Sequence, residues 1–264
     1  MNDDLRGEAA RLLLEAYTKR VPIAPLTEQF AGMDIDDAYA IQQLQVRAWE
    51  AIGRVIKGRK VGLTSLAMQH QFGVSQPDYG ILRGDMFYDS AAEIPVESFF
   101  QPRIEPEIAF VLHRDLAGPH VNVADAIAAV DFVLPALEII DSRIADWKIS
   151  ITDTIADNAS SGGLVLGERP TGIRDADLAA AGVVLRRHGR IVSTGTGAAV
   201  LGSPLLAVVW LANVLGARGS GLRAGDVVLP GSITAASTVQ PSDSWTADFG
   251  PLGSVTAHFG STND

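Results

Sequence analysis

The chain has 264 residues, of which 47% are hydrophobic and 20% are charged, so it is long enough to bury a sizeable core in one large domain. Its formal net charge of −10 argues against binding to a nucleic-acid backbone or an anionic membrane through bulk electrostatics. The absence of cysteine excludes disulfides, thiolate metal sites and cysteine nucleophiles.

The N-terminal part of the chain has the residue pattern of helices. A first helix is predicted over residues 3–18, and its acidic start does not fit a signal peptide. After a proline-containing connection, apolar residues within 35–52 fall on one helical face. Asp36 or Asp37 is a candidate cap for this second helix. We therefore expect an N-terminal helical segment over residues 1–58.

The remainder, residues 59–264, has a different texture. Short β-type runs alternate with turns rich in Gly, Pro, Asp and Asn. One helix is predicted after a candidate Asn122 cap, and another after Ser203, with Pro204 in its first turn. The runs are too irregularly spaced for repeated βαβ units, so we expect an α+β fold with a β-rich catalytic domain. The two segments are expected to form one integrated unit.

The most apolar window of the chain is Leu205–Leu215, which includes Asn213. It is too short to cross a membrane. Because the chain also lacks cysteine and shows no signal peptide, we expect a soluble cytoplasmic protein with no membrane or nucleic-acid partner.

Two carboxylates lie in the otherwise apolar run "QPRIEPEIAF", residues 101–110. In a strand, Glu105 and Glu107 project from the same face. Burying both is costly unless a positive group lies between them. A divalent cation with oxygen ligands, Mg²⁺ or Mn²⁺, meets this need. The alternative is a solvent-facing strand with alternating acids, which the spacing alone does not exclude.

A third acid strengthens the metal hypothesis. Glu138 lies within the apolar run "VLPALEII", which is a poor place for a lone charge. An ion pair with Arg143 or another basic residue is the alternative explanation. Three such carboxylates on two strand-like segments suit a hard divalent cation that keeps positions open for substrate.

Several ordered motifs resemble the 2-keto-4-pentenoate hydratases, a family of the fumarylacetoacetate hydrolase superfamily. The resemblance covers essentially the whole chain. The segments that carry it are "KVGLTS" (60–65), "GVSQPDYG" (73–80), "QPRIEPEIAFVL" (101–112), "LPALEIIDSRIADWKI" (134–149), "DTIADNASSGGLVLG" (153–167), "GAAVLGSPLLAVVWLAN" (197–213) and "GSVTAHF" (253–259).

The resemblance implies a fumarylacetoacetate hydrolase-like mixed sheet and a bound Mg²⁺ or Mn²⁺. The family's metal-binding glutamates fall on Glu105, Glu107 and Glu138. Pro106 stands where relatives usually have a small residue. Because proline lacks a backbone donor and suits an edge or a bulge, the local strand pairing is expected to be disturbed there.

The resemblance also implies a catalytic pair, Lys60 and Asp78. Taken alone, Lys60 has the pattern of a surface lysine, and Asp78 that of a local turn aspartate. As an active-site group near a metal, Lys60 is expected to have a lowered pKa that suits proton transfer. Asp78 belongs to the hydratase form of its motif, because related decarboxylases have an apolar residue there.

The polar segment "ADNASSGG" (156–163) is a candidate for substrate binding. Its Asn158, Ser160 and Ser161 offer donors for a substrate carboxylate, and Ser160 is the best candidate. An ordinary capped turn is the alternative. Family resemblance favours the lining of a pocket.

The implied activity is a metal-dependent hydratase, a hydro-lyase, acting in the breakdown of aromatic or sterol rings. It would add water to 2-hydroxypenta-2,4-dienoate, or a methyl homologue, to give the 4-hydroxy-2-oxo acid. The alternatives are a 4-oxalocrotonate-type decarboxylase and an acylpyruvate C–C hydrolase of the same superfamily. A non-catalytic partner subunit is a further alternative, although the intact constellation of Lys60, Asp78 and the glutamates argues against it.

The resemblance further implies a homo-oligomer, with a pentamer-based assembly as one form. A complex with a decarboxylase or an aldolase of the same pathway is a further expectation. The small 2-hydroxydienoate or 2-oxo acid substrate is the expected ligand.

Overall fold

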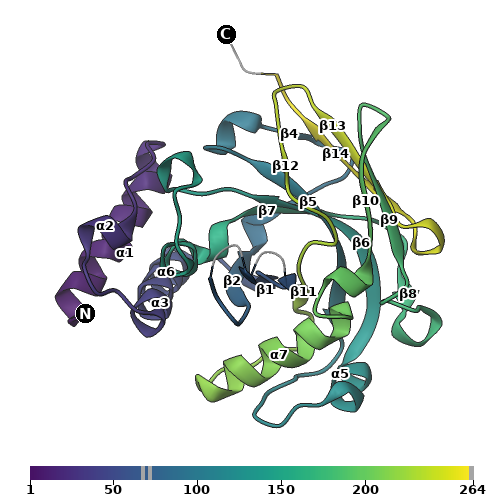
Figure 1. Ribbon diagram of the computed structural model, residues 1–264, viewed down its shortest axis with the longest axis horizontal. Coiled ribbons are helices and arrows are strands. Elements are labelled where there is room, and N and C mark those ends of the chain that lie inside the picture. The colour runs from purple at the N-terminus through teal and green to yellow at the C-terminus, as the bar shows by residue number, and fades with distance from the viewer. Residues whose placement is uncertain (67–68, 71–72, 262–264) are drawn as a thin grey trace.

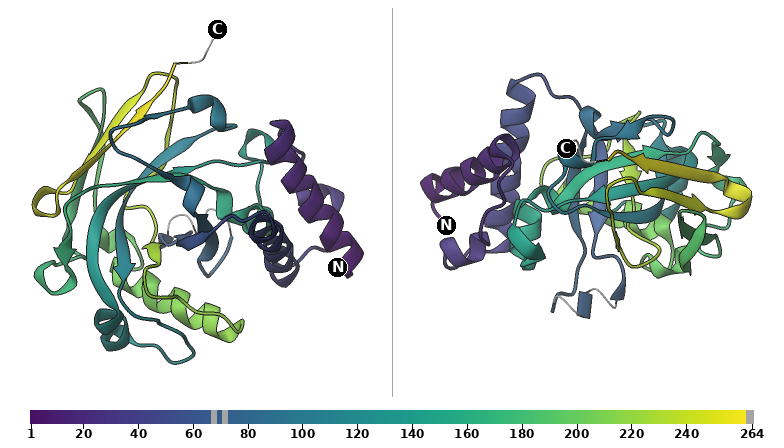
Figure 2. Two further views of the ribbon diagram at one scale, coloured as in Figure 1. Left: turned by 180° about the vertical axis from the view of Figure 1, so that it is seen from behind. Right: turned by 90° about the horizontal axis from the view of Figure 1, so that it is seen from above.

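The computed structural model describes residues 1–66, 69–70 and 73–261. N-terminal helices lie beside two β-sheets (Figure 1), which confirms the expected α+β class. Figure 2 shows that these helices stay on one side of the sheets. The α-helices are α1 (Asp3–Lys19), α2 (Leu26–Gln29), α3 (Ile35–Ala51), α5 (Val123–Ala129), α6 (Ile151–Ala156) and α7 (Pro204–Ala217).

The start of α3 corrects the cap prediction. Asp34, not Asp36 or Asp37, is the N-cap, and its side chain accepts a hydrogen bond from the Asp37 backbone N–H. Asp37 completes a capping box by accepting from the Asp34 backbone N–H. The helical part is also shorter than predicted, because α3 ends at Ala51 and the first strand begins at Ile56.

The larger sheet has nine strands within the described residues, in the order β2-β1-β11-β5-β6-β7-β3, with β12 beside β5 and β8 beside β6. Parallel and antiparallel pairs are mixed, since β1 is antiparallel to β2 and parallel to β11. Its strands are β1 (Ile56–Gly62), β2 (Asp78–Arg83), β3 (Phe87–Tyr88), β5 (Arg103–Leu112), β6 (Val130–Ile140), β7 (Ser161–Leu166), β8 (Thr171–Gly172), β11 (Val227–Leu229) and β12 (Ser237–Thr238).

The smaller sheet has five strands in the described part of the chain, in the order β10-β9-β13-β14-β4. It lies to one side of the long β6 strand in Figure 1. Its strands are β4 (Glu93–Ile94), β9 (Gly182–Arg187), β10 (Arg190–Thr196), β13 (Ser244–Asp248) and β14 (Ser254–Phe259).

Pro106 does not disturb the strand pairing, contrary to expectation. The register of β5 with β6 runs without a shift from Arg103 to Val111, and Pro106 stands opposite Leu137. The Pro106 carbonyl accepts a hydrogen bond from the Ile233 backbone N–H (3.1 Å). In a strand the N–H and C=O of one residue point the same way, so the missing donor faces the loop at Ile233 and not β6.

The N-terminal helices are bound to the β-rich part by both polar and apolar contacts. Gln42 of α3 donates to the carbonyls of Tyr79 and Ile155, and Gln45 donates to that of Ala156. One hydrophobic cluster includes buried residues of α1, α3, both sheets and α7. The helices therefore support the strands that carry the site described below.

Helix α7 shows that the apolar segment is longer than the window Leu205–Leu215. Together with the preceding turn it forms a 21-residue stretch, Gly197–Ala217, with a mean hydropathy of 2.0. By length and composition alone, that stretch is able to cross a membrane. In the structure, however, Val208, Leu211 and Ala212 are fully buried in the main hydrophobic cluster. Packing of this kind is that of a core helix in a globular protein.

Candidate active site

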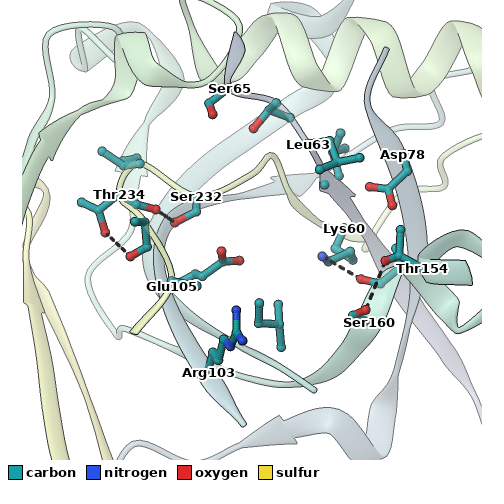
Figure 3. A pocket seen from close by; sticks show the side chains of 18 of the residues that line it. Lys60, Leu63, Ser65, Asp78, Arg103, Glu105, Thr154, Ser160, Ser232 and Thr234 are labelled. Atoms are coloured by element: carbon teal, nitrogen blue, oxygen red, sulfur yellow. Dashed lines mark hydrogen bonds between the residues drawn. The ribbon is translucent and has the colours of Figure 1, made fainter. Parts of the chain in front are cut away.

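A cavity of about 550 Å³ opens beside β1, β2 and β5. Its wall combines apolar and polar side chains that come from distant parts of the chain (Figure 3). The titratable and hydroxyl-bearing residues that line it are Lys60, Thr64, Ser65, Asp78, Arg103, Glu105, Thr154, Ser160, Ser232 and Thr234.

The three predicted glutamates meet at one wall of this cavity. Strand pairing brings them together, because Glu105 of β5 stands directly opposite Glu138 of β6. Glu107 lies two residues further along β5 and so projects from the same face as Glu105. One carboxylate oxygen from each of the three lies within 4.8 Å of the others. Glu105 lines the cavity, while Glu107 and Glu138 are almost completely buried behind it.

The oxygens of this cluster lack the partners that buried carboxylates normally have. Among the described residues, Glu107 Oε1 and Glu138 Oε2 have no hydrogen-bond partner, and Glu138 Oε1 has only the ion pair with Lys60 (3.3 Å). Glu107 Oε2 accepts from the Gly231 backbone N–H (2.8 Å). An all-oxygen set of this kind fits a hard divalent cation that keeps positions open for other ligands. The residues therefore form a candidate metal site.

Lys60 lies beside the glutamates on β1. Its Nζ donates to the Ala159 carbonyl (3.0 Å) and lies 3.3 Å from Glu138 Oε1. The residue is 4% exposed, so the interpretation as a surface lysine is wrong. Figure 3 shows the ammonium group at the cavity wall, between Glu105 and Ser160.

Asp78 reaches the same cavity from β2. It pairs with Gly62 of β1, and a Cβ on Gly62 would lie 2.2 Å from Asp78 Oδ1. Only glycine therefore leaves room for this carboxylate at the cavity wall. Asp78 is 2% exposed, and its Oδ1 has no hydrogen-bond partner among the described residues. An oxygen of this kind is available to a substrate or a water molecule.

Of the polar residues in segment 158–161, only Ser160 lines the cavity. Ser160 lines the cavity, and its Oγ lies 3.1 Å from the Thr154 hydroxyl. Asn158 instead donates to the Ile81 carbonyl and accepts from the Ile81 N–H. Neither Asn158 nor Ser161 lines the cavity. Of the three residues predicted to bind substrate, the structure therefore brings only Ser160 to the cavity wall.

This segment has an unusual backbone. Asn158, Ala159 and Ser160 have φ angles of 54°, 50° and 53°, a left-handed conformation that non-glycine residues adopt at a cost. Arg143, which is 1% exposed, holds the segment by donating to the backbone carbonyls of Asp157 and Ser161. This backbone conformation places the Ala159 carbonyl within hydrogen-bond distance of Lys60 Nζ.

Sequence reasoning missed several residues of the cavity wall. Arg103 lies two residues before Glu105, so strand alternation places it on the same face of β5 as Glu105. That spacing was the available signal. Thr154, Ser232 and Thr234 also line the cavity. They come from a short helix and a loop, and no simple residue pattern marks them.

Comparison with known proteins identifies the family of this chain. The model of the fumarylacetoacetate (FAA) hydrolase C-terminal family matches residues 59–259. A 2-keto-4-pentenoate hydratase of Paraburkholderia xenovorans (strain LB400) is 47% identical over 259 residues, which cover 98% of this chain and 96% of that protein. The chain belongs to the 2-keto-4-pentenoate hydratase family of the fumarylacetoacetate hydrolase superfamily.

Other members of this superfamily extend the comparison. The TodF product hydratase of Pseudomonas putida (strain F1) is 48% identical over 252 residues, covering 96% of this chain and 94% of that protein. The 4-oxalocrotonate decarboxylase from Pseudomonas putida G7, solved with magnesium and adipate, is 38% identical. It superposes with a TM-score of 0.95, with 98% of each chain covered. Hydratase and decarboxylase relatives therefore share this fold.

Burial raises the pKa values of the acids in the site, and repulsion between their carboxylates adds to this effect. Burial and the neighbouring Glu138 raise the pKa of Glu105 to about 7, against the lowering effect of Lys60. The same two causes raise the pKa of Glu107 well above its usual value. Burial also raises the pKa of Asp78 to about 6, and Lys60 opposes this shift. Protons therefore compete with a cation for the glutamates.

Without a metal, the pKa of Lys60 is raised, whereas the predicted lowering refers to a lysine beside a bound cation. Burial lowers this pKa, but the carboxylates of Glu138 and Asp78 raise it by more, so the net shift in the metal-free site is upward. The sequence indicated a lysine near a metal but not that carboxylates enclose it. In the metal-free site Lys60 is therefore a charged donor rather than a neutral base.

Metal stabilisation of this hydratase-family protein is expected to grow with pH. A raised carboxyl pKa means that the folded metal-free protein binds more protons than the unfolded chain between about pH 4.5 and pH 7. Its free energy of unfolding should fall as pH rises through that window, because this stabilisation is lost. Mg²⁺ has to displace these protons, so at one fixed Mg²⁺ concentration its effect on the melting temperature should be small at pH 5 and large at pH 7.5.

Thermal unfolding with and without Mg²⁺ at both pH values measures this effect. At a Mg²⁺ concentration one hundred times its Kd, about 2.7 kcal/mol of stabilisation is expected at pH 7.5. Glu107→Gln serves as the control and should show no Mg²⁺ effect at either pH. An equal Mg²⁺-induced shift at pH 5 and pH 7.5 would contradict the assignment of the raised pKa values to the metal site.

Proposed function

We propose that this protein is a metal-dependent hydratase that adds water to 2-hydroxypenta-2,4-dienoate, or a methyl homologue, giving the 4-hydroxy-2-oxo acid. The observation that carries the proposal is the meeting of the three-glutamate cluster, Lys60 and Asp78 at one cavity. Relatives named as hydratases, at 47% and 48% identity over nearly the whole chain, support it.

We propose Mg²⁺ or Mn²⁺ as the cofactor, held by Glu105, Glu107 and Glu138. When bound, the cation would supply Lewis-acid polarisation of the substrate carboxylate and 2-oxygen. The oxygen-only donor set supports this assignment, and so do Glu107 Oε1 and Glu138 Oε2, which have no hydrogen-bond partner among the described residues.

The protein's own residues account for the proton transfers. The dienol loses its 2-hydroxyl proton and gains a proton at C5, and then water adds its hydroxyl at C4 and a proton at C3. Lys60 and Asp78 are the titratable groups at the cavity wall outside the glutamates and Arg103. The Lys60 ammonium is placed to donate to a substrate oxygen. Asp78, with its raised pKa, suits proton exchange with the attacking water near neutral pH.

Replacing Asp78 by asparagine should slow hydration by about a hundred- to ten-thousand-fold, which is the usual contribution of general acid–base assistance. Binding of substrate and Mg²⁺ should persist, because Asp78 is not part of the glutamate cluster. The loss of dienoate absorbance in the ultraviolet, followed with and without Mg²⁺, measures the rate. Hydration by Asp78→Asn at the native rate would show that the carboxylate has no role in water addition.

A vinylogous decarboxylase is the second candidate. The decarboxylase from Pseudomonas putida G7 superposes over 98% of this chain, so the fold is compatible with that activity. Asp78 favours hydration, because the addition of water needs a group that positions or deprotonates it, and decarboxylation does not. The substrate of the alternative would be 2-oxohex-3-enedioate.

We further propose that the protein is cytoplasmic and acts as a homo-oligomer, as the family resemblance implies. Large exposed apolar side chains support self-association: Ile52 is 72% exposed and the nearby Val55 is 59% exposed. Light scattering on the purified protein tests this, and a monomer at micromolar concentration would contradict it.

A further inference from the structure

Arg103 is a cationic side chain of the cavity wall that Glu105 attracts electrostatically but that lies in no ion pair among the described residues. Among the described residues, no carboxylate forms an ion pair with it and nothing accepts a hydrogen bond from it. Its guanidinium carbon lies 4.3 Å from the ring centre of Trp147. Figure 3 shows the guanidinium directed into the cavity, below Glu105. Its N–H donors are therefore available to a ligand.

The position of Arg103 is fixed relative to the glutamate cluster. Arg103 and Glu105 are alternate residues of β5, so they project from the same face about 7 Å apart along the strand. Arg103 stands opposite Ile140, and Glu105 stands opposite Glu138. A small acid held at the cluster would therefore have the guanidinium at its side.

Trp147 is held over Arg103 at a conformational cost. Asp146 and Trp147 have φ angles of 57° and 54°, which non-glycine residues rarely adopt. The Trp147 indole N–H donates to the Gln101 carbonyl (3.1 Å), two residues before Arg103. This arrangement restricts the guanidinium to one plane, and a pre-organised arginine loses less entropy on binding a carboxylate.

The formal charges of the metal-bound site indicate why a further cation is useful there. Three ionised glutamates and an ionised Asp78 carry four formal negative charges, whereas Lys60 and a divalent cation would return three positive ones. An anionic substrate would then enter a site with a net negative charge. Arg103 brings the sum to zero and offers a planar pair of donors that matches a carboxylate.

We propose that Arg103, oriented by Trp147, binds the single carboxylate of a 2-oxo monoacid on the side away from Lys60, and so selects acids over neutral analogues. This inference rests on the proposed function, because it takes that substrate class from it. It assigns to Arg103 a role in binding and not in proton transfer.

Calorimetry with unreactive ligands tests the inference. The probes are 2-oxopentanoate and its methyl ester, titrated into the Mg²⁺-loaded protein. Arg103→Gln should weaken binding of the acid by about ten- to a hundred-fold, the usual effect of losing a hydrogen bond to a charged group, and leave binding of the ester within about two-fold. Arg103→Lys keeps the positive charge but loses the planar pair of N–H donors, so its affinity for the acid should fall by less than that of Arg103→Gln.

A matched control is Arg218→Gln, because Arg218 also lies 4.3 Å from an aromatic ring, that of Tyr39, but does not line the cavity. It should bind both probes like the native protein. Mg²⁺ affinity, titrated separately, should be unchanged or tighter in Arg103→Gln, since a positive charge beside the cluster is removed. Weaker Mg²⁺ binding would show that Arg103 only supports Glu105.

Three further results would overturn the inference. They are unchanged binding of the acid by both Arg103 variants, equal losses for acid and ester, and a loss confined to a six-carbon diacid such as 2-oxohexanedioate. The last would assign Arg103 to a second, distal carboxylate. Failure of the proposed function gives a different pattern: the native protein would not hydrate the dienoate, while the acid-specific loss in Arg103→Gln would remain.

Discussion

Glu107→Gln is expected to abolish the metal-dependent reaction while the protein stays folded. Glutamine has the size of glutamate, and its oxygen is able to keep the hydrogen bond from the Gly231 N–H. What is lost is one anionic ligand of the candidate site. Because a metal ion contributes several kcal/mol to stabilising developing charge, the rate should fall by about a thousand-fold or more.

The metal-free variant should be at least as stable as the native metal-free protein. Glu107 is 0% exposed and its Oε1 has no partner among the described residues, so a neutral side chain removes an uncompensated buried acid. Circular dichroism and Mn²⁺ titration measure fold and binding, with Glu97→Gln, at an exposed position, as the control. Native Mn²⁺ affinity and native turnover in Glu107→Gln would disprove the assignment.

Lys60→Ala is expected to slow turnover severely without preventing metal binding. Lys60 contacts Glu138 and the Ala159 carbonyl but is not a ligand. Its removal deletes a positive charge beside the glutamates, so Mg²⁺ should bind with equal or higher affinity. Loss of a positioned proton donor should reduce the rate by about a hundred- to ten-thousand-fold.

Two variants sharpen this experiment. Lys60→Met preserves most of the side-chain volume, so an equal rate loss in Lys60→Met and Lys60→Ala would assign the effect to the charge rather than to a cavity. Lys57→Met, on the same strand but exposed, should behave like the native enzyme. If Lys60→Ala turns over at the native rate, the lysine is structural.

The glutamate cluster is the part of the site that the sequence predicted best. Alternation in a strand fixes the shared face of Glu105 and Glu107, and an acid in an apolar run is conspicuous wherever it occurs. The register that sets Glu138 opposite Glu105 is a tertiary feature. No local pattern predicts it; the acids in two apolar runs suggested the grouping, and the family resemblance supported it.

Other features of the site depend on tertiary contacts that the sequence does not reveal. Asn158 lies in a polar segment, but whether an amide faces a cavity or a neighbouring strand depends on where β2 passes, and here Ile81 takes both of its groups. The pKa of Lys60 depends on carboxylates that are distant in sequence. The sequence shows Arg103 as a neighbour of Glu105, but it does not show that Arg103 forms no ion pair among the described residues, because ion pairs form only in the folded chain.

Product analysis of the native enzyme tests the central claim, hydration of a dienoate, most directly. Fresh 2-hydroxypenta-2,4-dienoate and 2-oxohex-3-enedioate are each incubated with the protein, with and without Mg²⁺, and the products are identified by nuclear magnetic resonance alongside carbon dioxide release. We predict Mg²⁺-dependent formation of 4-hydroxy-2-oxopentanoate from the dienoate. Carbon dioxide release from the diacid, with no hydration of the dienoate, would contradict the proposed function and the role given to Asp78.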